Sequence, residues 1–121
     1  MPPIEVVIFQ ERDRSVPLLQ WLDKLPDKVR MKIIARVERL AECGHELRRP
    51  ESDLLRDGIH ELRIGHSHVN YRLLYFFHGR QAVISHGITK EKEVPAREIE
   101  RAINRRSQYG ADPLKHNYHA G

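Results

Sequence analysis

Apolar positions along this chain alternate between strand-like and helical spacing, and this change of period predicts the order of its elements. Ile4–Phe9 is short and rich in β-branched residues, as is typical of a strand. After a polar connection, Ser15 is expected to cap a short helix with Pro17 in its first turn, where the missing N–H of proline is tolerated. This helix should end near Lys24, because Pro26 cannot continue it.

The clearest helical pattern follows, over Lys28–Cys43, with Asp27 as the expected N-cap and Gly44 at the position after the last turn. One stripe of this helix is apolar, at Val29, Ile33, Val37 and Leu40. The opposite side carries many basic residues. Such a face is usually a solvated helix surface, and contact with nucleic acid or a ribosome is the alternative.

Three consecutive strands are predicted in the second half of the chain, after a loop over His45–Asp57. They are Ile59–Ile64, Val69–Phe77 and Gln81–Ile88, joined by turns at Gly65–His68 and His78–Arg80. The middle strand contains the run Leu73–Phe77, which is apolar at every position. A strand that is apolar on both faces is central in its sheet and has other elements packed on each side.

A last helix is expected from Pro95 to about Arg106, and residues 107–121 are expected to form a flexible tail. The resulting order is β-α-α-β-β-β-α. It indicates an α+β fold in which a three-strand antiparallel meander is joined by the first strand, with the two N-terminal helices packed on the sheet. Residues 1–106 should form a single domain.

Composition agrees with one folded domain and narrows the classes of partner. The chain has 121 residues, of which 40% are hydrophobic and 31% charged, with a net charge of +4. The positive balance favours an anionic partner such as nucleic acid. A single cysteine excludes an internal disulfide and fits the cytoplasm, and we expect no signal peptide and no membrane span.

Several common chemistries find no support in the sequence. It has no Gly-rich phosphate loop and no G-x-S-x-G motif. Cys43 lies inside a helix without an evident histidine partner, so it is expected to pack rather than react. His66 and His68 have the spacing of neighbours on one strand face, but a zinc site needs three or four ligands. We therefore expect no metal and no cofactor.

Cations on the predicted strands offer a different possibility. With a two-residue turn at His66–Ser67, Arg63 would face Asn70 and Glu61 would face Arg72 across the ladder. The latter pair is then an ordinary cross-strand ion pair, worth under ~1 kcal/mol if exposed. The end of the next strand, however, brings further basic residues near these arginines: His86, Lys90 and Lys92.

Such a gathering of cations suits a visiting phosphodiester. Arginine binds phosphate oxygens in a bidentate manner, and lysine supplies a compact charge or, with a lowered pKa, a proton acceptor. RNA carries its own nucleophile in the 2′-hydroxyl, so a protein could cleave it without metal by alignment and charge balance.

Four segments together resemble the RelE/ParE superfamily, and most closely its HigB-type, phage-derived branch. They are ELR at 61–63, YRLLYFF at 71–77, HGITK at 86–90 and VPAREIERA at 94–102. The resemblance covers about residues 4–106 and includes the order of strands and helices.

This resemblance implies a toxin of a type II toxin–antitoxin pair that cuts mRNA in the ribosomal A site and is neutralised by a small antitoxin, often a helix-turn-helix protein. Arg63 and Arg72 match the strand arginines of the family, and Lys90 matches its basic position after the last strand. For the general base, Lys90, Lys92 and His86 stay open as candidates. Where the family often has two adjacent lysines, this chain has Glu91 after Lys90, which weakens the local positive field.

Two other functions remain open on the same fold. ParE-like relatives act on DNA gyrase without cutting nucleic acid, and a further alternative is a family member that only binds its antitoxin. The clustered basic residues favour RNA cleavage, since a gyrase inhibitor has no need of a phosphate grip on the sheet.

Overall fold

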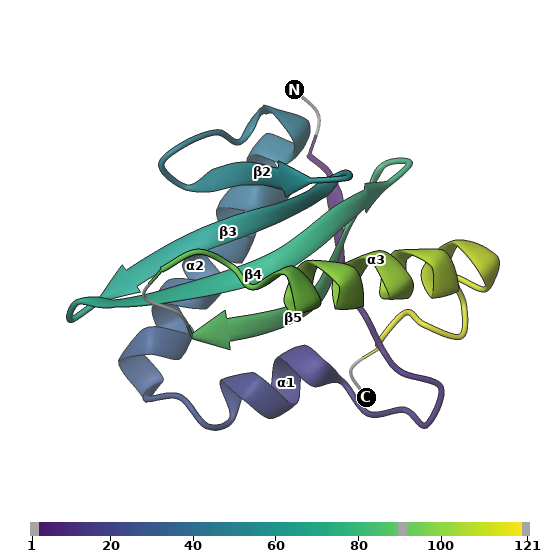
Figure 1. Ribbon diagram of the computed structural model, residues 1–121, viewed down its shortest axis with the longest axis horizontal. Helices are drawn as coiled ribbons and strands as arrows, with labels where there is room; N and C mark the ends of the chain where they lie inside the picture. Colours follow the sequence, from purple (N-terminus) through teal and green to yellow (C-terminus); the bar gives the residue numbers. More distant parts are fainter. Residues whose placement is uncertain (1–2, 90–91, 120–121) are drawn as a thin grey trace.

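The computed structural model describes residues 3–89 and 92–119, and within them it confirms an α+β fold (Figure 1). A five-stranded sheet in the order β1-β5-β4-β3-β2 lies between two helices on one side and one on the other. The elements are β1 (Glu5–Ile8), α1 (Pro17–Leu22), α2 (Asp27–Cys43), the short 3₁₀ helix η1 (Gly44–Glu46), β2 (Ser52–Arg56), β3 (Ile59–His66), β4 (Val69–His78), β5 (Gln81–Thr89) and α3 (Ala96–Ala111).

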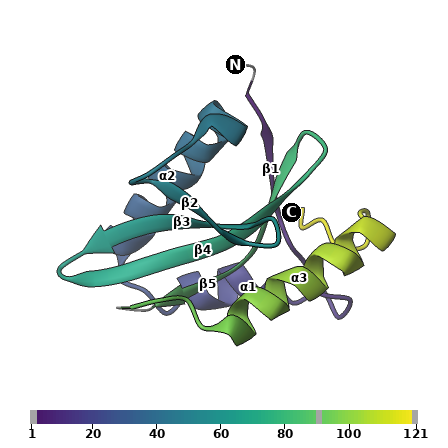
Figure 2. The same cartoon turned by 45° about the horizontal axis from the view of Figure 1, so that its top comes forward.

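The pairing of the strands explains why β4 is apolar on both faces. It lies in the middle of the sheet, paired antiparallel to β3 and β5. β1 joins the other edge of β5 in parallel, so the first strand extends the meander as the sequence predicts. With α1 and α2 behind the sheet and α3 in front of it, each face of β4 is covered, and two cores form (Figure 2).

The two cores draw on alternate residues of the same strands. Leu62, Leu73 and Tyr75 pack toward the helices α1 and α2, and Leu74 and Phe76 pack toward α3. This is the two-residue period of a pleated strand. A side chain of this kind contributes about 1.5–3 kcal/mol when fully buried, so both layers stabilise the central strand.

α1 reaches the sheet through a contact that only a glycine permits. A Cβ placed on Gly87 of β5 would lie 2.2 Å from an atom of the Trp21 ring. Trp21 also meets Tyr71 edge-on, with ring centroids 6.2 Å apart. Because Gly87 has no side chain, the indole of Trp21 can pack directly against the backbone of β5.

The predicted register of the β3–β4 hairpin is wrong. Its two turn residues are Ser67 and His68, with φ of 50° and 67°, as a type I′ turn requires. Arg63 consequently faces Arg72 rather than Asn70. The partner shifts by two residues along β4, and an even shift leaves every side chain on its predicted face.

The predicted loop before β3 is wrong in part, because it contains the edge strand β2. Asp57 and Gly58, with φ of 52° and 79°, form a second two-residue turn, and Arg56 pairs with Ile59 across it. Asp-Gly is a strong hairpin signal in sequence, and the apolar residues Leu54 and Leu55 shortly before it belong to β2.

The residues that precede the first two helices also differ from the prediction. Val16 precedes α1 in place of Ser15. Pro26 precedes α2, where Asp27 is the first helical residue.

Residues 107–119 have a defined structure, whereas the sequence predicts a flexible tail over residues 107–121. α3 continues five residues past Arg106 to Ala111. The segment after it returns to the start of the chain, where Tyr118 donates to the carbonyl of Ile8, and Gln10 donates to the carbonyl of His116. His116 is fully buried and stacks on Phe9 at 5.0 Å. Few apolar residues lie in this segment, so backbone hydrogen bonds and one aromatic ring hold it.

Candidate anion-binding site

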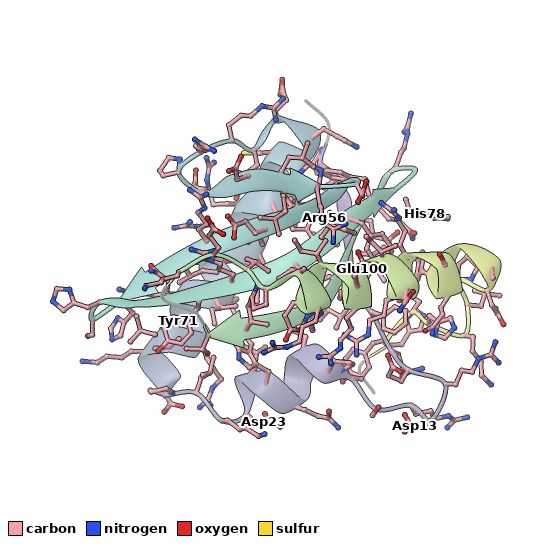
Figure 3. All side chains as sticks on the ribbon, in the orientation of Figure 1. Asp13, Asp23, Arg56, Tyr71, His78 and Glu100 are labelled. Carbon is pink, nitrogen blue, oxygen red and sulfur yellow. The ribbon has the colours of Figure 1, made fainter. Side chains whose placement is uncertain are left out.

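Arg63 and Arg72 lie directly opposite one another on β3 and β4. They share the sheet face that α3 covers farther along the strands. The β3–β4 hairpin extends beyond the first turn of α3, and in Figure 1 only the segment that leads into α3 crosses in front of β4 at this end (Figures 1 and 2). In Figure 3, Tyr71, the neighbour of Arg72, marks this end of β4, whereas His78 marks the end beside α3.

A buried carboxylate lies between the two arginines. Glu61 is 1% exposed, and its Oε2 accepts a hydrogen bond from Arg63 Nε at 2.8 Å. Its Oε1 lies 3.3 Å from Arg72 Nη1, on the diagonal of the ladder. The sequence-based prediction of an ion pair between Glu61 and Arg72 is confirmed. Within the described part of the chain, however, Oε1 receives no hydrogen bond, because the guanidinium of Arg72 is not aligned with it.

The ion pairs continue to the edge strand. Arg63 also reaches Asp53 Oδ2 at 3.2 Å, and Asp53 binds Arg49 at 2.7 Å. These neighbouring arginines lower the pKa of Asp53, with the hydrogen bond from Arg49 as the largest cause. Three guanidinium groups thus share two carboxylates, which leaves one net positive charge in this cluster.

A hollow of about 350 Å³ opens beside the cluster. It is lined by Arg36, Pro50, Arg63, Ile64, Gly65, Asn70, Tyr71 and Arg72. It forms because β2 pairs with β3 only as far as Leu62 and a single further hydrogen bond at Arg63, so the outer part of β3 has no strand beside it. The Arg72 side chain is 16% exposed and that of Arg63 is 38% exposed, both on this hollow.

Arg36 of α2 joins the hollow from the other side of the sheet. It donates to the backbone carbonyl of Arg63 and lies 3.6 Å from Glu51, which also receives two hydrogen bonds from Arg39. In the sequence, Arg36 is one of the many basic residues opposite the apolar stripe of α2. Its role depends on the close approach of α2 to β3, which no local pattern indicates.

Of the basic residues predicted after β5, the structure describes only Lys92. Lys90 and Glu91 lie outside the described residues. Thr89, which precedes them, pairs with Tyr71, so the chain leaves β5 one residue away from Arg72 along the neighbouring strand. Lys92 is exposed and does not line the hollow.

His86 is placed under α3 and does not line this hollow. It is 5% exposed; its Nε2 donates to Glu98 Oε1 at 3.0 Å, and its Nδ1 accepts from the Ser85 hydroxyl at 2.7 Å. Burial, with the nearby charge of Arg105, lowers the pKa of His86 to about 4. Both ring nitrogens are thus occupied in a neutral imidazole, an arrangement that favours a packing role for His86 over proton transfer.

The arrangement is suited to binding an anion rather than a metal. Among residues 3–89 and 92–119, no three His, Cys, Asp or Glu side chains gather as metal ligands, and no helix there is long and apolar enough to cross a bilayer. Arg72 makes no hydrogen bond to any described side chain, so its donors can turn to a phosphate oxygen in the hollow. The cost of desolvating this arginine is already offset by Glu61.

Comparison with known proteins places the chain in a family. A family model described as phage-derived protein Gp49-like (DUF891) matches residues 20–107, which contain both arginines and all strands but β1. No curated protein matches the chain. The match spans well over half of the sequence, and the chain therefore belongs to the Gp49-like phage-derived proteins, a RelE/ParE-like toxin family.

Proposed function

We propose that this protein is the toxin of a type II toxin–antitoxin pair, and that it cleaves mRNA in the ribosomal A site without a metal ion. Membership in a RelE/ParE-like toxin family supports the general class. The observation that carries the cleavage proposal is the direct pairing of Arg63 with Arg72 at an accessible hollow. A position in the HigB-type branch stays a prediction, as does a helix-turn-helix antitoxin as partner.

The proposed chemistry needs little beyond these side chains. The 2′-oxygen of the RNA attacks the neighbouring phosphorus and the bond to the 5′-oxygen breaks. The proton of the 2′-hydroxyl passes to a base, and the departing 5′-oxygen takes up a proton from water. The products are a 2′,3′-cyclic phosphate and a 5′-hydroxyl. Arg72, assisted by Arg63, would bind the phosphate oxygens and stabilise the extra negative charge of the transition state. Lys90 or Lys92 remains the proposed proton acceptor, since His86 is enclosed beneath α3.

One observation favours a second candidate function. Glu61 neutralises part of the charge of both arginines and is fully enclosed between them. A pair of arginines held mainly by a carboxylate is also what a purely structural ion-pair network would show. The second candidate is therefore a toxin that acts by binding, as ParE-like relatives do on DNA gyrase.

Expression in a bacterial host separates the two functions. We would induce the wild-type protein and the Arg72→Ala and Arg72→Lys variants, and then map the 5′ ends of cellular mRNA and the supercoiling of a reporter plasmid. Under the first proposal, wild type gives new mRNA ends in phase with codons and normal supercoiling. Arg72→Ala should lose at least ~100-fold of the cutting, and Arg72→Lys should retain only a part, because lysine cannot bind phosphate in a bidentate manner.

Arg80→Ala is the matched control, because Arg80 is an exposed arginine in the turn at the opposite end of β4. It should cut like wild type. Thermal melts of the purified variants check that Arg72→Ala is folded. Growth arrest with intact mRNA and altered supercoiling would instead establish the binding toxin and overturn the nuclease.

A further inference from the structure

A second and larger hollow lies on the other side of the sheet edge, next to the end of α2. Its volume is about 560 Å³, within the range of small-molecule sites. Its walls come from η1, the segment that follows it, β2, β3 and β4. It shares no lining residue with the hollow at Arg63 and Arg72 among the described residues.

An exposed histidine forms a flat platform in this hollow. The His45 ring stacks on Phe77 with centroids 3.8 Å apart and an angle of 22° between the planes. Phe77 is held in turn by edge contacts with His60 and Tyr75, at 5.1 and 5.6 Å. One face of His45 is thus fixed against a packed aromatic ring, while the residue as a whole remains exposed. Planar aromatic surfaces of this kind stack nucleobases with little dependence on sequence.

The hollow is also lined by polar side chains that match the edge of a base. His60 stacks on Tyr75 at 5.2 Å, and its ring nitrogens make no hydrogen bond to any described residue. A neutral imidazole has one donor and one acceptor, which matches the mixed pattern on the edge of a base. Ser52, which is buried and also lines the hollow, is hydrogen-bonded to the hydroxyl of Tyr75.

Two arginines stand beside the stacking platform. Arg48 donates to the backbone carbonyls of His45 and Leu47 through Nη1, which holds it beside the ring and leaves its other nitrogens for a ligand. Arg49 is bound to Asp53 at 2.7 Å, and Asp53 also pairs with Arg63, whereas Arg48 makes no ion pair with a described carboxylate. An aromatic platform with an adjacent guanidinium suits a ring that carries a phosphate.

We propose that this hollow binds one unpaired nucleotide, with its base stacked on His45 and its phosphate against Arg48. The chemistry is shared by a nucleotide within single-stranded RNA and by a free nucleoside monophosphate. This site goes beyond the proposed cleavage function, because it uses different residues on the other side of the sheet edge and exists whether or not Arg72 acts on RNA.

The test uses 2-aminopurine, a fluorescent base that is quenched when it stacks. The full chain is titrated with 2-aminopurine riboside monophosphate and, separately, with a single-stranded hexaribonucleotide carrying one central 2-aminopurine. Wild type should quench at least one probe, and His45→Ala should weaken that binding about ten-fold and remove most of the quenching. His45→Phe should restore both, since it keeps a stacking ring.

The variants distinguish the sites and the sources of the ligand. Arg12→Ala, at an exposed arginine between β1 and α1 that does not line this hollow, should bind and quench as wild type does. Stronger quenching of the hexanucleotide than of the monophosphate identifies RNA as the ligand, and equal quenching identifies a free nucleotide. Absence of quenching with both probes, or quenching that survives in His45→Ala but is lost in Arg72→Gln, would overturn the proposal.

Discussion

Glu61 Oε1 lies 3.3 Å from Arg72 Nη1, and these two residues are diagonal rather than opposite neighbours on β3 and β4. The directly opposite partner of Arg72 is Arg63, which would be an unfavourable like-charge pair by itself. Glu61 compensates both cations from one buried position. The same carboxylate therefore stabilises the hairpin and opposes the binding of a phosphate.

We expect Glu61→Gln to separate these two effects. The amide keeps an acceptor for Arg63 but removes the negative charge between the arginines. The free energy of unfolding should fall by about 1–3 kcal/mol, because a buried charged hydrogen bond is lost. Affinity for a short single-stranded RNA should rise several-fold at low salt and lose this gain at high salt. Urea unfolding and RNA titration measure the two.

Glu100→Gln provides the control for this change. Glu100 pairs with Arg56 at 2.6 Å, but its side chain is 58% exposed, and Figure 3 places the pair at the far side of the sheet from Tyr71. Both its stability and its RNA affinity should stay near wild type. Weaker RNA binding by Glu61→Gln would contradict the view that Glu61 opposes the anion.

The enclosed histidine of β5 predicts how stability depends on pH. The pKa of His86 is lowered to about 4 from an ordinary value of 6.5, mainly by burial and then by Arg105. The unfolded chain therefore binds a proton that the folded chain excludes between these values. The contribution of neutral His86 to the free energy of unfolding is complete above pH 6.5. It is lost as the pH falls from 6.5 toward 4, by up to about 3 kcal/mol.

Urea unfolding at pH 7.0 and at pH 4.5 measures this loss. His86→Gln should be less stable at pH 7 but should lose less on acidification. The pKa of His60 is also lowered, mainly by burial, so some pH dependence in the same direction should persist in the variant. An unchanged difference between the two pH values in His86→Gln would show that other groups cause it.

The close contact between Trp21 and Gly87 predicts the effect of adding a single methyl group at residue 87. Gly87→Ala places a Cβ into the indole ring and forces α1 off β5, which should cost about 1–3 kcal/mol in the free energy of unfolding. Gly110→Ala is the matched control, because a Cβ there meets nothing within 4 Å and Gly110 lies inside α3. It should stabilise the protein by about 0.5–1 kcal/mol. Chemical unfolding of both variants tests the pair, and equal effects would contradict the packing argument.

The returning C-terminal segment gives a fourth prediction. His116→Ala removes the ring that stacks on Phe9 and the hydrogen bond from Nδ1 to the carbonyl of Gln10. We expect a loss of about 1–3 kcal/mol, since the ring is fully enclosed. Amide hydrogen exchange at Gln10 and Tyr118 should accelerate at the same time. His119→Ala, at an exposed position three residues on, should change neither quantity.

Much of the fold follows from local patterns of the sequence. The helical stripe of α2 and the apolar run of β4 are strong enough to place both elements, and the strand order around β4 follows from its two apolar faces. β2 was missed because edge strands are short and half-polar, although the Asp57–Gly58 turn beside it was a usable signal. The ordered C-terminal segment carried no such signal, since its contacts are made with residues about a hundred positions away.

The candidate site, too, was predicted only in part from the sequence. The faces of Glu61, Arg63 and Arg72 are determined by the sequence, because the side of a strand on which a residue lies depends only on its parity. Which of these charges meet was decided by the register, and the register depends on two non-glycine residues, Ser67 and His68, at positive φ. The enclosure of His86, the approach of Arg36 and the platform of His45 on Phe77 each join segments that are distant along the chain. Such contacts arise from packing of whole elements, and so only the tertiary structure could decide them.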